Sequence, residues 1–188
     1  YYNLFLDTGL VNKVYIAHSN KLNSTKSNEY EKKFNKPLST SLHNRLLKGP
    51  YQKFDTTMYS NYIIDECSMI NEEDKQAIFQ QCKGRVIMCG DIGFQLPAIQ
   101  GEEMTEKGFD NVIELSENRR KYKNGDIVFE KPKQKCELRH GFTIHSVQGE
   151  DYENNIYISN MCPHYQLNRM FYTAISRTRT LNQIFIIS

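Results

Sequence analysis

The chain has 188 residues, of which 39% are hydrophobic, so it is large enough for one packed domain or two small ones. Its 24 basic and 22 acidic side chains give a net charge of only +2, so the chain as a whole has no strong electrostatic attraction to nucleic acid. Any nucleic-acid binding must come from local basic patches. No apolar stretch is long enough to cross a bilayer, so no membrane partner is expected. The five cysteines include no CxxC pair, which argues against zinc or a disulfide framework and favours a reducing intracellular compartment: cytoplasm, nucleus or viral factory.

Short apolar runs alternate with helical or polar segments in the first half of the chain. The run KVYIA is typical of a buried strand, and Asn71 followed by three acids is typical of a helix start. In chain order the pattern predicts a helix over 1–10, a strand over 13–17, a loop with a little helix over 20–36, a helix over 38–47, a strand over 61–65, a helix over 72–81 and a strand over 85–89.

The second half continues in the same way. Alternating strands and helices predict an α/β fold with a mainly parallel sheet, in which ligands gather at the carboxyl ends of the strands. The predicted elements are strands over 112–115, 126–130, 139–143 and 156–159, a helix over 167–177 and a last strand over 183–187.

Two acids, Asp65 and Glu66, stand where the buried strand at 61–65 ends, in the run YIIDECSMI. Asp65 could hold a hydrated magnesium ion, because Mg²⁺ prefers oxygen ligands and keeps several waters. Glu66 beside it could orient or deprotonate an attacking water. On its own, an Asp-Glu pair more often has no catalytic role and consists of two polar residues where a strand reaches solvent.

A second run, GDIGFQLPAI, follows the strand at 85–89 and shifts the balance toward function. Its acid, Asp91, again comes directly after a strand. Gln95 lies on a loop stiffened by the following leucine and proline, where its amide could bond a terminal phosphate and report its loss. The two runs together suggest a site for phosphoryl transfer, a reaction that needs chiefly positioning and charge neutralisation.

The sequences DECSM and GDIGFQLP, in this order and spacing, resemble motifs II and III of superfamily 1 helicases. Upstream, YIAHSNKL at residues 15–22 resembles motif Ia, a strand end that touches single-stranded DNA. TSLHNRLL at residues 40–47 resembles the Thr-x-His helix that often follows motif Ia. This resemblance implies nucleic-acid contacts at His18, Ser19 and His43.

Two later segments resemble the arginine motifs of the same family. LSENRR at residues 115–120 resembles motif IV, and FYTAISRTRT at residues 171–180 resembles motif VI. In the family both motifs supply an arginine that reaches the nucleotide from the second lobe. The matching positions are Arg120 and the arginine finger Arg177.

FTIHSVQGED at residues 142–151 resembles motif V. In the family its threonine and histidine, here Thr143 and His145, face the nucleic-acid backbone. Its Gln-Gly turn, here Gln148 and Gly149, opens a helix near the phosphates.

Six motifs in this order imply two RecA-like lobes with mainly parallel sheets, over residues 1–114 and 115–188. The cofactors implied are ATP and Mg²⁺, with the ion held by Asp65 through water. The resemblance assigns catalytic roles to Glu66, Gln95, Arg120 and Arg177, and nucleotide contacts to Asp65, Asp91, Gln148 and Gly149.

The forms of motifs V and VI look like the RecD-like branch, superfamily 1B. That likeness implies an ATP-dependent helicase or translocase moving 5′ to 3′ on single-stranded DNA. Forked duplex DNA and proteins of replication or repair are the partners expected.

Two departures leave an alternative open. No GxxxxGK[ST] phosphate-binding loop occurs, so this loop is expected to precede Tyr1 in a longer protein, and the chain alone should bind ATP poorly. The stretch from Arg120 to Asn124-Gly125-Asp126 is also shorter than in the family. The alternative is a helicase-like module that no longer hydrolyses ATP and binds nucleic acid or protein.

Overall fold

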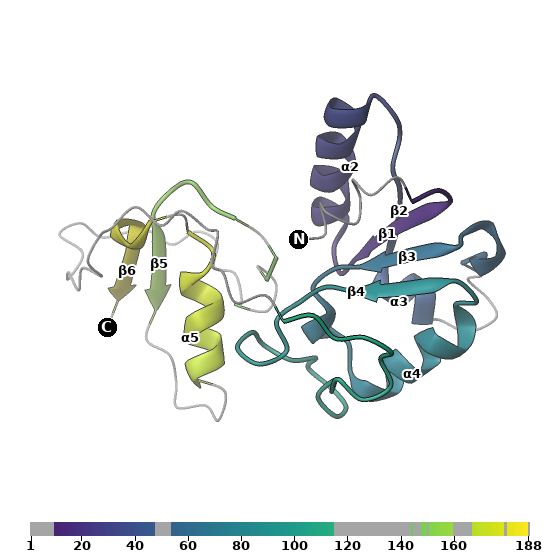
Figure 1. Cartoon of the computed structure of the whole chain (residues 1–188). Coiled ribbons are helices and arrows are strands. Elements are labelled where there is room, and N and C mark those ends of the chain that lie inside the picture. Colours follow the sequence, from purple (N-terminus) through teal and green to yellow (C-terminus); the bar gives the residue numbers. More distant parts are fainter. Residues whose placement is uncertain are drawn as a thin grey trace. The chain divides into compact units, whose positions relative to one another are not determined.

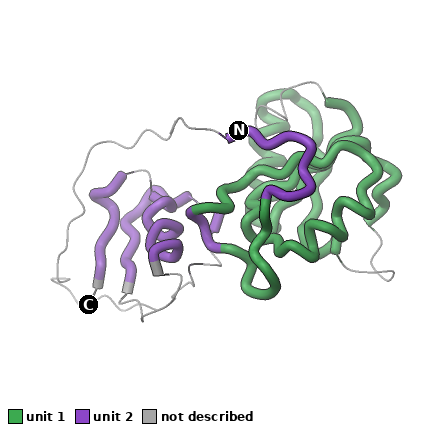
Figure 2. The backbone as a smooth tube through the Cα atoms, turned by 60° about the horizontal axis from the view of Figure 1, so that its bottom comes forward, with its two compact units in different colours: residues 1–93, 97–105 green, residues 94–96, 106–188 purple. Residues whose placement is uncertain are grey.

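The computed structural model describes residues 10–47, 54–114, 144, 148–149, 151–159, 167–178 and 180–187. Contacts divide the chain into two compact units, residues 1–93 with 97–105 and residues 94–96 with 106–188 (Figure 2). Each unit contains a parallel sheet, of four strands in the first and two in the second (Figure 1). The predicted α/β class with parallel sheets is confirmed.

The first unit is built on a sheet of order β2-β1-β3-β4, in which all neighbouring strands are parallel. The register pairs Tyr15 with Ile63 and Ile16 with Ile64. Its elements are β1 (Lys13–Ala17), α2 (Asn20–Phe34), β2 (Ser39–Leu42), α3 (His43–Leu47), η1 (Thr56–Met58), β3 (Asn61–Ile64), η2 (Cys67–Met69), α4 (Glu72–Gln81) and β4 (Arg85–Met88).

Helices cover both faces of this sheet (Figure 1). Side chains alternate along β1 and β3, because successive residues of a strand point to opposite faces. One face packs with Leu46 of α3 and Ile78 of α4, and the other with Leu22 of α2. Both central strands are therefore buried on two sides, which explains their continuous apolar runs.

The segment 20–36, predicted as mostly loop, instead forms the 15-residue helix α2. The Ser19 side chain caps its start by accepting a hydrogen bond from the Leu22 amide (3.2 Å). Asn35, in the left-handed conformation, ends the helix and donates its amide to the Glu31 carbonyl. Capping at both ends and packing of a single apolar edge outweigh the polar composition.

Two further predictions were wrong in part. Residues 38–47 do not form one helix, because Ser39–Leu42 pair with β1 as β2 and only His43–Leu47 are helical. The leucine spacing could not reveal this, because pairing with β1 is a tertiary interaction. Residues 112–114 form no strand.

The second unit contains the predicted strand-helix-strand pattern. Ile158, Ala174 and Ile184 form its buried cluster, which joins the helix to both strands. The predictions at 1–9, 115, 126–130 and 139–143 lie outside the described residues. The elements are β5 (Ile156–Ser159), α5 (Leu167–Ile175), η4 (Leu181–Gln183) and β6 (Ile184–Ile187).

Within the described ranges, no helix combines the length and apolar character needed to cross a membrane.

At the amino edge of the first sheet, Gly84 lies against the backbone of Ser60. A Cβ at Gly84 would lie 2.4 Å from the Ser60 carbonyl oxygen, which also accepts a hydrogen bond from the Arg85 amide (2.8 Å). Backbone that carries a ladder hydrogen bond cannot shift aside cheaply. A glycine is therefore required before β4.

We expect Gly84→Ala to lower the free energy of unfolding by about 1–3 kcal/mol, because the added methyl overpacks this contact. Urea denaturation followed by circular dichroism measures the change. Gly93→Ala is the matched control, because the nearest atom to its added Cβ would be 3.9 Å away. Equal stability of the two variants would contradict the close approach at Gly84.

Candidate functional site

The carboxyl ends of the four parallel strands bring most of the predicted first-lobe residues to one edge of the sheet. The register of neighbouring strands places the residues after β1, β3 and β4 next to one another in space. The side chains at this edge are His18 and Ser19 after β1, His43 after β2, Asp65 and Glu66 after β3, and Asp91 after β4.

Asp65 lies at the centre of a set of hydrogen bonds at this edge, and only 8% of its surface is exposed. One carboxylate oxygen, Oδ2, accepts a hydrogen bond from the Tyr15 hydroxyl (2.5 Å). The other, Oδ1, accepts from the Glu66 amide (3.0 Å). The Asp65 backbone amide donates to the Ile16 carbonyl (2.9 Å), and its carbonyl accepts from Nε2 of His43 (2.9 Å). Three segments of the unit thus fix this one residue.

The electrostatics of the edge follow from burial. Desolvation raises the pKa of the Asp65 carboxyl, and the hydrogen bonds from Tyr15 and the Glu66 amide act in the opposite direction. Burial, followed by the nearby His18 ring, lowers the pKa of His43 to about 4. His43 is therefore neutral near pH 7 and carries its proton on Nε2, since a carbonyl oxygen can only accept.

Glu66 has a left-handed backbone (φ 53°, ψ 47°), which is uncommon for a residue with a side chain. The turn directs the chain into η2, where the Cys67 amide donates to the Cys89 carbonyl (3.0 Å). A Cβ at Gly90 would lie 2.8 Å from both the amide nitrogen and Sγ of Cys67. The loops after β3 and β4 are therefore packed directly together.

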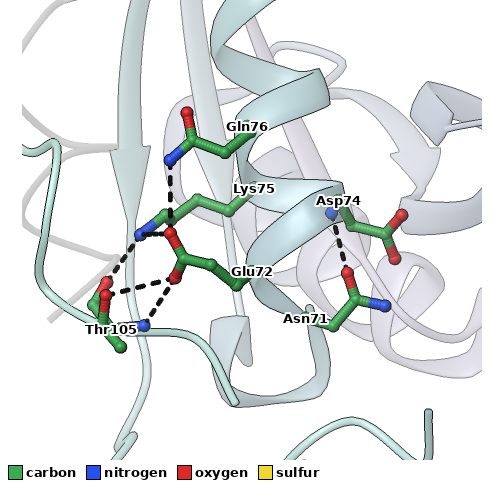
Figure 3. A network of polar contacts seen from close by, with 6 residues as sticks. All are labelled: Asn71, Glu72, Asp74, Lys75, Gln76 and Thr105. Atoms are coloured by element: carbon green, nitrogen blue, oxygen red, sulfur yellow. Dashed lines mark hydrogen bonds and ion pairs between the residues drawn. The ribbon is translucent and has the colours of Figure 1, made fainter. Parts of the chain in front are cut away.

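The segment around Thr105, which follows the loop after β4, is anchored to the first turn of α4 (Figure 3). Lys75 is fully buried, and its Nζ contacts Glu72 (2.7 Å) and donates to the Thr105 carbonyl (2.8 Å). Glu72 in turn accepts from the amide (2.9 Å) and hydroxyl (3.2 Å) of Thr105. Asn71 caps α4, as predicted, by accepting from the Asp74 amide (2.7 Å). We call Glu72, Lys75 and Thr105 the clasp.

The clasp makes stability sensitive to acid. The hydrogen bond from Lys75, followed by that from the Thr105 amide, lowers the pKa of Glu72 from 4.5 to about 2. Because the folded-state pKa is depressed, the ionised carboxylate stabilises the fold above pH 4.5, and this contribution is lost as the pH falls toward 2.

We predict that Glu72→Gln flattens the dependence of unfolding free energy on pH between 4.5 and 2. Denaturant unfolding at a series of pH values measures this slope. Glu73→Gln, at the exposed neighbouring position of α4, is the matched control and should keep most of the slope, because it leaves the clasp intact. An unaltered slope in Glu72→Gln would show that the clasp does not hold this carboxylate ionised.

Gln95 and Gln148, from the predicted motifs III and V, are brought together. Nε2 of Gln148 donates to Oε1 of Gln95 (3.1 Å) and to the Leu96 carbonyl (3.4 Å). Gln148 and Leu96 are both fully buried. Residues 94–96 group with the second unit, whereas the flanks of their loop group with the first. Gly149 follows with φ +80°.

Arg177 lies just beyond the end of α5 and is only 1% exposed. Its Nε donates to the Thr173 carbonyl (3.0 Å), and its Nη2 donates to the Ser176 hydroxyl (2.7 Å). These bonds hold the guanidinium against its own helix. The other predicted residues of the second lobe, Arg120, Thr143 and His145, lie outside the described residues.

The donor set at Asp65 fits a hydrated magnesium ion. In the described part of the chain, no group of three or more His, Cys, Asp or Glu side chains could hold a metal ion. The two donors to the Asp65 carboxylate, a phenol and a backbone amide, are neutral and leave its negative charge in place. Each oxygen also keeps lone-pair capacity, which suits an ion bound through its waters.

The sequence patterns do not predict a role for Tyr15 at this site. It is fully buried in β1 and contributes the shortest hydrogen bond to Asp65. The available signal was a single aromatic hydroxyl among the aliphatic residues that follow Lys13 in the strand. Only the β1–β3 register shows that this hydroxyl faces the carboxylate.

No family model matches the chain, and no curated protein sequence matches it. Among solved structures, the chain is similar to the structure of PRRSV helicase, with 11% sequence identity and a TM-score of 0.50. The match covers 98% of this chain and 48% of that chain, so this chain spans about half its length. The likeness shows the fold alone: the chain has a helicase-like α/β fold with parallel sheets.

Proposed function

We propose that this chain is part of an ATP-driven helicase or translocase of the superfamily 1 kind, acting on single-stranded DNA. One observation carries the proposal: Asp65 and Glu66 lie directly beside the Gly90–Asp91 loop at the carboxyl edge of a parallel sheet. The two segments resemble motifs II and III of such enzymes. Both lie at the carboxyl ends of parallel strands, which is where α/β folds bind nucleotides.

The chemistry follows from the acids. Asp65 would hold a magnesium ion through water, and the bound ion would neutralise phosphate charge. Glu66 orients the attacking water and accepts its proton. The left-handed turn at Glu66 and the packed Cys67–Gly90 contact constrain the backbone that carries this side chain. Asp91 lies on the neighbouring loop, at the same edge of the sheet.

Gln95 is the candidate sensor of the terminal phosphate. Its amide oxygen accepts a hydrogen bond from Gln148, so a change at either glutamine is transmitted to the other. A pair of this kind links the motif III loop to motif V. Through this pair, loss of the terminal phosphate would change the contacts that motif V makes with DNA.

Arg177 and Arg120 are the proposed arginines of the second lobe. To reach a phosphate, Arg177 must exchange its bonds to Thr173 and Ser176 for bonds to oxygen atoms of the nucleotide. The exchange preserves hydrogen bonding and adds charge pairing, so it is favoured when a nucleotide is present. The arginine then stabilises charge on the transferring phosphoryl group.

The choice of DNA and of 5′ to 3′ movement rests on the RecD-like form of motifs V and VI. His18, Ser19 and His43 in the first lobe, with Thr143 and His145 in the second, are the proposed nucleic-acid residues. Contacts of this kind address the backbone, so binding should tolerate sequence and weaken with salt.

The burial of Arg177 favours a second candidate function. A buried guanidinium that is already bonded to Thr173 and Ser176 suits a helicase-like module that binds nucleic acid or protein without hydrolysing ATP. The two functions differ in one observable, ATP hydrolysis stimulated by single-stranded DNA.

We predict that the full-length protein hydrolyses ATP when single-stranded DNA is added, and that Glu66→Gln lowers this rate about 100-fold or more, because the water loses its base. DNA binding, measured by fluorescence anisotropy, should persist. Glu114→Gln, at an exposed position, is the control.

Full ATPase activity in Glu66→Gln would remove Glu66 from the catalytic role. If the unaltered protein binds DNA but shows no DNA-stimulated ATP hydrolysis, the proposed motor function is wrong and the binding module is the better account.

A further inference from the structure

The hydroxyl of the buried Tyr15 donates its hydrogen bond to a carboxylate. Its ring lies in the middle of β1, fully buried, and its hydroxyl donates to Oδ2 of Asp65, 50 residues away, at 2.5 Å. The register that pairs Tyr15 with Ile63 puts the ring beside β3, two residues before the carboxylate. The hydroxyl and Asp65 therefore meet on the same face of the sheet.

Tyr62 on the neighbouring strand shows what a structural tyrosine does in this sheet. It is equally buried, but its hydroxyl donates to backbone carbonyls of Thr56 and Tyr59. Those bonds satisfy a polar atom and anchor the turn before β3. Tyr15 instead donates to a carboxylate, which gives a charge-assisted hydrogen bond of short length.

The geometry at Asp65 defines the plane of its carboxylate. Oδ1 is held by the amide of the neighbouring residue Glu66, and Oδ2 by the Tyr15 hydroxyl from β1, so each oxygen has its own tether. With one tether the group could rotate about its terminal torsion, which is broad for aspartate. With two, the remaining lone pairs point in fixed directions before any ligand arrives.

We propose that Tyr15 is a positioning residue that pre-orients the Asp65 carboxylate for the hydrated metal ion. The inference rests on the proposed function, because it takes Asp65 as the metal-holding acid. Groups that orient a metal-binding side chain typically change metal affinity or activity about 10–100-fold when removed. Tyr15 itself does not touch the ion.

The decisive comparison is Tyr15→Phe against Tyr62→Phe in the full-length protein. Each variant keeps the ring and loses one hydroxyl from a fully buried position of the same sheet. Two quantities are measured: Mn²⁺ affinity by electron paramagnetic resonance in the presence of a non-hydrolysable ATP analogue, and the Mg²⁺ concentration that half-saturates DNA-stimulated ATPase.

Tyr15→Phe should weaken Mn²⁺ binding and raise the half-saturating Mg²⁺ concentration about tenfold or more, with a smaller change in the rate at saturating metal. Tyr62→Phe should lower thermal stability and leave both metal quantities unchanged. Replacing Tyr15 with 4-aminophenylalanine, which restores a donor at the same ring position, should recover metal affinity.

Equal metal affinities in Tyr15→Phe, Tyr62→Phe and the unaltered protein would overturn the inference. A loss of affinity in Tyr15→Phe that 4-aminophenylalanine does not rescue would also overturn it, since the effect would then come from packing. If the unaltered protein lacked ATPase but bound Mn²⁺ more weakly after Tyr15→Phe, the proposed motor would fail while the positioning role stood.

Discussion

The parallel pairing of β1 with β3 is the constraint on which the rest of the site depends. Its register sets Tyr15 opposite Ile63, and so turns the phenol toward the carboxylate that follows β3. Sliding either strand by one residue would turn its side chains to the other face and separate Tyr15 from Asp65. Both strands are buried on two faces by apolar packing, and that packing holds the register.

Backbone contacts extend this constraint into the loops. The Cys67 amide joins the loop after β3 to the end of β4, and Gly90 has no room for a side chain beside it. The clasp holds the next segment to α4 through the buried ammonium of Lys75. The loops that carry the acids at the edge are thus held by hydrogen bonds and close packing, and such preorganisation is what electrostatic stabilisation of a charged ligand requires.

Part of this arrangement could be predicted from the sequence. β1, β3 and β4 were predictable because continuous apolar runs end in polar residues, and the cap at Asn71 because a good capping residue precedes three acids. α2 was not, because its polar composition hides a helix stabilised by caps and one packed edge. The Tyr15–Asp65 bond joins residues 50 positions apart, and no local pattern encodes such a contact. Residues such as Arg120 and His145 lie outside the described part, so their roles stay predictions.

Anomalous diffraction from crystals of the full-length protein, grown with Mn²⁺ and a non-hydrolysable ATP analogue, tests the central claim most directly. The metal should lie about 4 Å from the Asp65 carboxylate, one water away, with the nucleotide phosphates at the carboxyl edge of the four-stranded sheet. A metal peak and nucleotide density at the amino edge near Gly84, or anywhere remote from Asp65, would contradict it.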